Sequence, residues 1–423
     1  MTIMNKRSVI VALSSFIGLG WVSVGLAAAE STAADRAILS AQGSLRRHQS
    51  DASAYYRLGD AYIQKARETG DVAYFARAEA ALEKSLALNP RHSGATRHLA
   101  YVLYSVHDFA KAAALATTAV ELDPTDGHVY GILGDANLEI GNYDEAEAAY
   151  RRMLERERDL HAWGRLAGLK SIRGDVASAI DMLTRAIEDG KANRRPRESL
   201  AWAQWQLGTE HFAIGDVKAA EARYRDSLAT YPNYHRALAG LAQVRTAQKR
   251  YAEAVDLYQK AIAVIPLPDY AAALGDLQVK TGRVDAATRQ YELVEYIGRL
   301  NALNRTLYNR ELAYFYADHD RQLGRALELA RRELEVRRDI YAYDVLAWAL
   351  YKNGELGEAR AAIGEALKLG TQDARLFFHA GMIHLGFGDR DVGRAYLRRA
   401  LSTNPHFHLL HADLARRLLN DEP

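Results

Sequence analysis

Histidine is the residue type in this sequence most able to bind a metal, and it gathers near the C-terminus. The five residues there are His379, His384, His406, His408 and His411. A transition-metal site needs three or four such ligands within bonding reach of one ion. No spacing among them matches a recognised ligand motif, and His411 stands at a helix position where packing is expected. A metal site that uses His384 and His408 is therefore an alternative interpretation, and we expect no cofactor.

Motifs for catalysis are absent from the sequence. The chain has no cysteine, and it contains no HExxH, GxSxG or glycine-rich phosphate loop. Repeated Gly-Asn and Gly-Asp pairs could suggest cation binding, but glycine commonly ends one helix while Asn or Asp caps the next. We interpret the pairs as turns between helices and predict that the protein is not an enzyme. They are Gly141-Asn142, Gly174-Asp175, Gly215-Asp216 and Gly388-Asp389.

The charge balance argues against a large basic surface. The chain has 55 Lys and Arg residues and 53 Asp and Glu residues, a net charge of +2 at pH 7. A nucleic-acid-binding protein should carry a basic excess clustered on one face. We therefore expect no nucleic-acid partner. The hydrophobic fraction of 49% and the charged fraction of 26% are ordinary for a soluble helical protein.

Helices must position these side chains, and residues 127–154 show their pattern most clearly. An apolar face that includes Gly134 marks a first helix, because residues three or four apart face the same side. A turn at Gly141-Asn142 is followed by a second helix that carries Ala146 and Tyr150 at helical spacing. Gly134 and Ala146 are small where two helices cross closely, and Tyr150 is large enough to fill the gap between them. The segment predicts a helical hairpin.

Prolines show that this unit repeats along the chain. Pro90 and Pro124 are 34 residues apart, as are Pro232 and Pro266, and Pro405 follows the same kind of apolar segment. Proline lacks an N–H and has a fixed φ, so it ends a helix at little cost. A lone hairpin cannot bury its apolar faces and needs neighbours of the same kind.

This pattern resembles the tetratricopeptide repeat, a helix–turn–helix unit of about 34 residues. The resemblance covers roughly residues 52–420 and implies an all-α solenoid that forms a right-handed superhelix. The family's pair of small residues and its closing alanine match Gly134 with Ala146, Gly208 with Ala220, Gly275 with Ala287, and Ala347 with Ala359 and Ala366.

The repeat register predicts the domain organisation of the chain. The period slips after the seventh repeat, and we expect a kink or a division of the array there. The predicted segments are an N-terminal capping helix at 30–51, repeats one to seven at 52–294, an irregular connector at 295–311, repeats eight to ten at 312–405, and a C-terminal capping helix at 406–423.

The first 29 residues are typical of a bacterial Sec-type signal peptide. Lys6-Arg7 form a positive region, residues 9–26 are apolar, and Ala27–Ala29 fit a small-residue cleavage site. Cleavage would leave no membrane span, and the lack of cysteine excludes lipid attachment at the end of the signal. We expect a periplasmic or secreted protein. The alternative is a retained anchor, because about 18 apolar residues can cross a bilayer.

In the family that the sequence resembles, the first helix of every hairpin lines a concave groove that binds partner peptides. Transferring its groove-facing positions to this chain gives a set in which aromatic residues outnumber any one charge, and such residues often anchor peptides. The alternative is that many of them pack between repeats. The candidates are Tyr101, Tyr104, Trp205, Phe212, Arg310, Tyr314, Trp348, Tyr351 and Phe378.

The resemblance implies a non-catalytic scaffold of the bacterial cell envelope that binds a segment of another protein in its concave groove. Two alternatives from other classes remain open at this point. One is a metal-handling envelope protein that uses the C-terminal histidines, and the other is an assembly factor for polysaccharide export or synthesis. Function in such arrays depends on the chemistry of the groove rather than on the fold.

Overall fold

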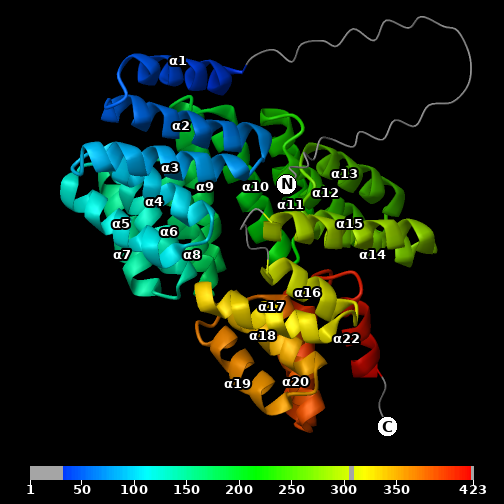
Figure 1. Ribbon diagram of the computed structural model, residues 1–423. Coiled ribbons are helices and arrows are strands. Elements are labelled where there is room, and N and C mark those ends of the chain that lie inside the picture. The colour runs from blue at the N-terminus through cyan, green and yellow to red at the C-terminus, as the bar shows by residue number, and fades with distance from the viewer. Residues whose placement is uncertain (1–31, 304–308, 421–423) are drawn as a thin grey trace, which may run out of the picture.

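The computed structural model describes residues 32–303 and 309–420, and within these ranges it consists of α-helices without strands (Figure 1). The predicted all-α solenoid of helical hairpins is confirmed. The predicted signal peptide, residues 1–29, lies outside the described residues. None of the helices in the described part has the length and apolar composition that a bilayer-spanning segment needs.

Seven hairpins form what we call the N-terminal array, preceded by α1 (Ala33–Arg47). Consecutive helices of each hairpin pack against each other. The pairs are α2 (Ala52–Thr69) with α3 (Ala73–Leu88), α4 (Ser93–Ser105) with α5 (Phe109–Leu122), α6 (Gly127–Glu139) with α7 (Tyr143–Arg156), α8 (Leu160–Ile172) with α9 (Val176–Ala192), α10 (Arg197–Ala213) with α11 (Val217–Thr230), α12 (His235–Ala247) with α13 (Tyr251–Val264), and α14 (Pro268–Lys280) with α15 (Val284–Leu303).

Three further hairpins form the C-terminal array, which α22 (His411–Asn420) follows. The predicted connector, residues 295–311, overlaps the end of α15, the start of α16 and residues 304–308, which lie outside the described residues. The pairs are α16 (Asn309–Asp318) with α17 (Leu323–Val336), α18 (Ile340–Lys352) with α19 (Leu356–Leu367), and α20 (Ala374–Phe387) with α21 (Arg390–Thr403).

In several hairpins, α8 with α9 among them, the turn is set by a glycine and the residue that follows it. Gly174 has φ +80°, the left-handed region that glycine adopts without strain, and it separates α8 from α9. Asp175 then caps α9, because its carboxylate accepts a hydrogen bond of 3.2 Å from the Ser178 N–H. The interpretation of this Gly-Asp pair as a turn and a helix cap is confirmed.

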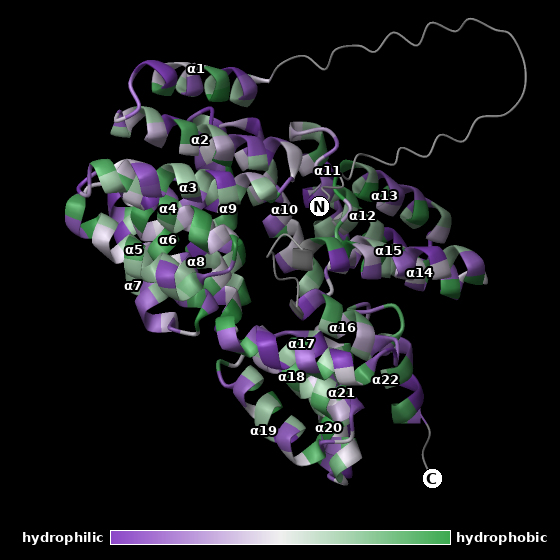
Figure 2. Ribbon diagram, in the orientation of Figure 1, coloured by the Kyte–Doolittle hydropathy of each residue, from purple (hydrophilic) through white to green (hydrophobic). Residues whose placement is uncertain are grey.

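Close helix crossings depend on glycine facing tyrosine. A Cβ atom added at Gly134 would lie 2.3 Å from the Tyr150 ring, and one at Gly275 would lie 2.4 Å from the Tyr291 ring. Neither position has room for a side chain, because such distances are far below van der Waals contact. The predicted filling of the Gly134 gap by Tyr150 is confirmed, and Gly208 faces Tyr224 in the same way. Figure 2 shows apolar and polar residues alternating along most helices, as amphipathic packing requires.

The chain turns back on itself, so that the C-terminal array packs against the middle of the N-terminal array (Figure 1). One hydrophobic cluster joins the two arrays; from α7 and α8 it contains Tyr143, Leu166 and Leu169, and from the C-terminal array it contains Ile340 and Ile363. We call this contact the array interface. It places side chains about 200 residues apart in sequence side by side.

Helix ends supply the polar contacts of the array interface. The last carbonyl groups of an α-helix have no partner within that helix. Here the Glu139 carbonyl at the end of α6 accepts a hydrogen bond of 2.9 Å from the Arg338 N–H, and the Phe212 carbonyl near the end of α10 accepts one of 2.7 Å from the Asn404 side-chain amide. The Ile172 carbonyl of α8 accepts from the Thr371 hydroxyl. Three successive first helices of the N-terminal array thus have their ends satisfied by loops of the C-terminal array.

Candidate functional site

The first helices of neighbouring hairpins are joined by polar pairs. In the N-terminal array, Arg165 of α8 binds both carboxylate oxygens of Asp135 on α6, with its closest contacts at 2.8 Å. The Arg97 guanidinium lies 2.6 Å from the Asp126 carboxylate, and the two residues are 29 positions apart. Residues about one repeat apart meet in this way because the first helices lie beside one another in the stack. The face they form carries fixed charges as well as aromatic rings.

Three of the nine predicted groove residues lie in the core of the C-terminal array. Trp348 is 2% exposed, Phe378 0% and Tyr314 6%. The Trp348 ring stacks on His379 with centroids 4.3 Å apart, and Phe378 stacks on His411 at 4.6 Å. Their ring surfaces are therefore covered by neighbouring side chains.

Five of the predicted residues keep partly accessible side chains. Trp205 faces Arg236, whose guanidinium carbon lies 5.0 Å from the ring centroid. Tyr351 stacks on Trp348 at 5.1 Å. Burial raises the pKa of Tyr104 well above its ordinary value, with the charges of nearby carboxylates adding to the effect. The binding role of this set stays a prediction. The residues are Tyr101, Tyr104, Trp205, Phe212 and Tyr351.

Arg310 belongs to an ion network at the array interface. Its guanidinium lies 3.0 Å from the Asp339 carboxylate, 3.4 Å from Glu333 and 3.9 Å from Glu139 of α6. Arg337 binds the same two glutamates at 2.7 Å each. Glu333 is fully buried, and burial of a carboxylate is costly unless it is paired, as it is with these arginines. In this structure Arg310 therefore links the two arrays.

The two histidines of the alternative metal hypothesis contact different residues. His384 lies 3.2 Å from the Asp389 carboxylate and stacks on Tyr396 at 5.6 Å. His408 caps α22, stacks on His411 at 4.2 Å, and has its Nε2 3.9 Å from Asp276. The two histidines share no partner among the contacts of the described residues.

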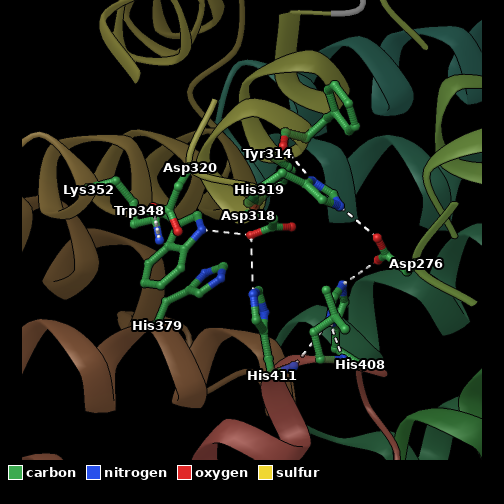
Figure 3. Close-up of polar contacts among 12 residues, drawn as sticks. Asp276, Tyr314, Asp318, His319, Asp320, Trp348, Lys352, His379, His408 and His411 are labelled. Atoms are coloured by element: carbon green, nitrogen blue, oxygen red, sulfur yellow. Dashed lines mark hydrogen bonds and ion pairs between the residues drawn. The ribbon is translucent and has the colours of Figure 1, made fainter. Parts of the chain in front are cut away.

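A different polar cluster fills the space between the first helices of the C-terminal array (Figure 3). The Tyr314 hydroxyl donates a hydrogen bond of 2.7 Å to Asp344, and Asp344 lies 2.9 Å from the Nδ1 of His379. Asp318 accepts a bond of 2.7 Å from the Trp348 indole N–H and lies 3.6 Å from the Nε2 of His411. This cluster was not predicted from the sequence. Its signal is the spacing of Tyr314, Asp344 and His379, each about one repeat after the last.

Asp276 connects this cluster to the N-terminal array. Its carboxylate accepts a hydrogen bond of 2.8 Å from the Tyr291 hydroxyl and lies 2.6 Å from the Nε2 of His319. Burial alone would lower the pKa of His319, but the hydrogen bond to Asp276 and the charge of that carboxylate outweigh it and raise the pKa. The pair therefore favours the protonated form of the His319 imidazole.

Two cavities lie at the contact between the N-terminal array and the C-terminal part of the chain. One of about 520 Å³ is lined by residues of the turn before α13, by Lys280, and by the segment from Pro405 to Arg416. Lys280 crosses beside it to the Asp413 carboxylate at 2.7 Å. The other, of about 570 Å³, lies between the start of α7 and residues Lys368 and Leu369. Packing of distant parts of the chain thus creates recesses that the repeat pattern alone would not reveal.

Comparison with known proteins identifies the repeat. The tetratricopeptide repeat family matches residues 74–126, 99–162, 206–271 and 345–406. The solved human IFIT1 dimer with PPP-AAAA is 17% identical, with a TM-score of 0.49 over 75% of this chain and 73% of that one. PilW, a type IV pilus biogenesis factor, is 19% identical, with a TM-score of 0.41 over 48% of this chain and 92% of that one. At these levels the likeness concerns the fold alone.

Curated relatives match about half of the chain. Cellulose synthase operon protein C of Pseudomonas fluorescens (strain SBW25) is 29% identical over 53% of this chain and 17% of its own length. Cellulose synthase 1 operon protein C of Komagataeibacter xylinus is 26% identical over 47% and 15%. The chloroplastic PsbB mRNA maturation factor Mbb1 of Chlamydomonas reinhardtii is 28% identical over 46% and 30%. The matched part thus spans less than a third of each relative.

These names cover different molecular partners, so the expected lack of a nucleic-acid partner stays a prediction. The family assignment does not depend on them. The family's matches extend over more than half of the sequence, and the described helices pair into successive hairpins; the chain belongs to the tetratricopeptide repeat family.

Proposed function

We propose that the protein is a non-catalytic scaffold that binds a segment of another protein along the first helices of its N-terminal array. One observation carries the proposal: aromatic side chains at the predicted groove positions of this array are partly accessible, whereas Trp348 and Phe378 in the C-terminal array are buried. Aromatic rings supply much of the binding energy where a partner covers them. Membership of a repeat family that builds binding surfaces supports the same function.

Charged groups beside these rings would orient the bound segment. Arg236 covers one face of Trp205 at 5.0 Å, and the Arg165–Asp135 pair lies on neighbouring first helices. Charges at the rim of an interface contribute to orientation and to the association rate more than to affinity. The proposed partner is therefore a segment with apolar side chains flanked by charged residues.

The proposed location is the bacterial cell envelope. Lys6-Arg7, the apolar run of residues 9–26 and Ala27–Ala29 support export through a signal peptide. Relatives from cellulose synthase operons also fit a role at the envelope.

The test is affinity capture from an envelope extract with matched variants. The binding variant carries Tyr101→Ala and Trp205→Ala, and the control carries Tyr231→Ala and Tyr296→Ala. The control tyrosines are 42% and 51% exposed and lie at the end of α11 and within α15, the second helices of their hairpins. We expect one partner to be retained by the unmodified chain and the control and lost with the binding variant. Equal retention by both variants, with unchanged circular dichroism, would overturn the proposal.

A second candidate function is assembly of an exported polysaccharide. It is favoured by the two relatives from cellulose synthase operons. In that case the accessible aromatic rings would stack on sugar instead of peptide. Binding of cello-oligosaccharides to the chain, reduced at least tenfold by Trp205→Ala and unchanged by Tyr231→Ala, would favour this candidate over the first.

A further inference from the structure

Three side chains of metal-ligand type converge inside the C-terminal part of the molecule (Figure 3). Asp318 ends α16, His379 lies within α20, and His411 begins α22. One carboxylate oxygen and one nitrogen from each imidazole all lie within 4.8 Å of one another. We propose that Asp318, His379 and His411 bind a divalent transition-metal ion. Two imidazoles and a carboxylate suit Zn²⁺, and Fe²⁺ takes the same set of ligands.

His379 presents a free nitrogen to this point. The residue is fully buried, and its Nε2 has no hydrogen-bond partner. Its Nδ1 lies 2.9 and 3.0 Å from the two oxygens of Asp344. An ionised carboxylate can only accept, so Nδ1 carries the proton and Nε2 keeps its lone pair. A buried acceptor without a partner is costly, and a metal ion would satisfy it.

Asp344 holds His379 in the way that supporting carboxylates hold metal-binding histidines. It is fully buried and also accepts a hydrogen bond of 2.7 Å from the Tyr314 hydroxyl. The Arg375 guanidinium lies over the Tyr314 ring at 4.3 Å. The ring of His379 is therefore fixed by groups that take no part in binding the ion.

The other two ligands are also held independently of an ion. The His411 ring lies between Phe378 at 4.6 Å and His408 at 4.2 Å, and both contacts are stacked. Its Nε2 is 3.6 Å from Asp318, too long for a hydrogen bond. Asp318 is oriented by the Trp348 indole N–H at 2.7 Å. All three ligands thus face one another from three packed helices, α16, α20 and α22.

Bond lengths decide how much the site must adjust. Zinc bonds of about 2.0–2.1 Å set neighbouring ligand atoms about 3.4 Å apart in a tetrahedron. The most distant ligand atoms here, which lie within 4.8 Å of one another, must therefore approach by up to about 1.4 Å. Asp318 is the last residue of α16 and His411 the first of α22, a helix of 10 residues, so both ligands belong to element ends. Three protein ligands leave a fourth position for water or for a group of a bound molecule.

The experiment measures zinc binding to the chain after removal of metal with a chelator. Equilibrium dialysis against Zn²⁺ should give one ion per chain, and Co²⁺ in its place should give the visible absorption of a tetrahedral site. His379→Gln and His411→Gln should each weaken Zn²⁺ binding at least 100-fold. Asp344→Asn should weaken it about 10–100-fold, because it removes a supporting group rather than a ligand. His384→Gln is the matched control and should leave binding unchanged.

A second measurement keeps the test valid if a buried variant folds poorly. Saturating Zn²⁺ should raise the unfolding temperature of the unmodified chain and of His384→Gln, but not that of His379→Gln. No bound zinc in the unmodified chain, or equal loss with His384→Gln, would overturn the proposal. The readout is metal binding, so it is independent of whether a protein partner binds the N-terminal array.

Discussion

The two arrays use the same repeat but place a first-helix tryptophan in different environments. Trp205 of the N-terminal array is partly accessible and contacts Arg236, whereas Trp348 of the C-terminal array is 2% exposed and is stacked between Tyr351 and His379. The difference comes from what lies across the first helices. In the C-terminal array α22 and His411 cover them. A repeat position therefore does not decide by itself whether an aromatic side chain is a surface anchor or part of a core.

One polar pair from each array differs in the same way. Asp135 and its partner Arg165 are both partly accessible, and their side chains are 18% and 27% exposed. Asp344 and His379 are both fully buried. Fully buried polar groups are costly unless satisfied, so they need a specific partner or an ion. From this comparison we predict that the N-terminal array binds a macromolecule. We predict that the buried polar groups of the C-terminal array bind a specific partner or an ion.

The largest expected effect is the difference in stability loss between alanine variants of Trp348 and Trp205. Trp348→Ala should lower the free energy of unfolding by about 3–5 kcal/mol, because it leaves a cavity in the core. It also removes the indole donor of Asp318. Trp205→Ala should lower it by only about 1 kcal/mol, because the ring is partly accessible. Urea unfolding followed by circular dichroism measures both. Equal losses for the two variants would mean that the arrays do not differ as described.

Replacing Arg310 at the array interface should lower the free energy of unfolding nearly as much. Arg310→Ala removes one of the two arginines that balance Glu139 and the fully buried Glu333. Removing one partner from a buried ion network typically costs about 3–5 kcal/mol. Urea unfolding should show this loss, and small-angle scattering should show a larger radius of gyration if the arrays separate. Arg325→Ala is the control, because its pair with Glu328 is partly exposed. It should cost less than about 1 kcal/mol.

Removing a single hydroxyl group compares a hydrogen bond between the arrays with a hydrogen bond within one array. The Tyr143 hydroxyl of α7 accepts a hydrogen bond of 2.8 Å from the Ile340 N–H, one of the unpaired donors at the start of α18. Tyr143→Phe should cost about 1–3 kcal/mol, because it leaves that buried N–H without a partner. Tyr150→Phe should cost less, since its acceptor Asp135 keeps Arg165. Hydrogen exchange at the start of α18 should increase only in the first variant.

Local pattern was enough to predict the hairpins. Gly134 and Tyr150 are 16 residues apart, and their contact follows from helical spacing and the small size of glycine, so both can be recognised in one repeat. The turn at Gly174-Asp175 is equally local. The fold class therefore required no information about distant parts of the chain.

The array interface could not be predicted in the same way. The bond between Tyr143 and Ile340 joins residues 197 positions apart, and nothing in either local sequence marks them as partners. The burial of Trp348 and Phe378 and the gathering of Asp318, His379 and His411 follow from how distant helices pack. His411 was expected to pack, and it does pack on Phe378, but packing does not exclude a free ring nitrogen. Site residues were thus harder to predict than elements, because they depend on the superhelix as a whole.

The smallest effect that still separates the arrays is the pH dependence of two histidines. On α12 of the N-terminal array, burial and the nearby Arg236 charge lower the pKa of His235 to about 4, whereas Asp276 raises the pKa of His319 above 6.5. A lowered folded-state pKa gives stability that is present above the unfolded value of 6.5 and is lost as the pH falls towards 4. A raised one gives stability that is present below 6.5 and is lost as the pH rises through the folded-state value.

Urea unfolding between about pH 5 and pH 8 should therefore give opposite trends for two variants. His319→Gln should cost most stability at the acidic end, where the ion pair with Asp276 is fully formed, and progressively less as the pH rises. His235→Gln should cost least at the acidic end, because the unmodified chain there loses stability through protonation of the unfolded state. Parallel curves for the two variants would mean that neither the burial of His235 nor the pairing of His319 controls its protonation. Both histidines contribute to the stability of a first helix, and only their surroundings differ. Opposite pH trends in the stability cost of the two variants would therefore show that these surroundings cause the difference between the arrays.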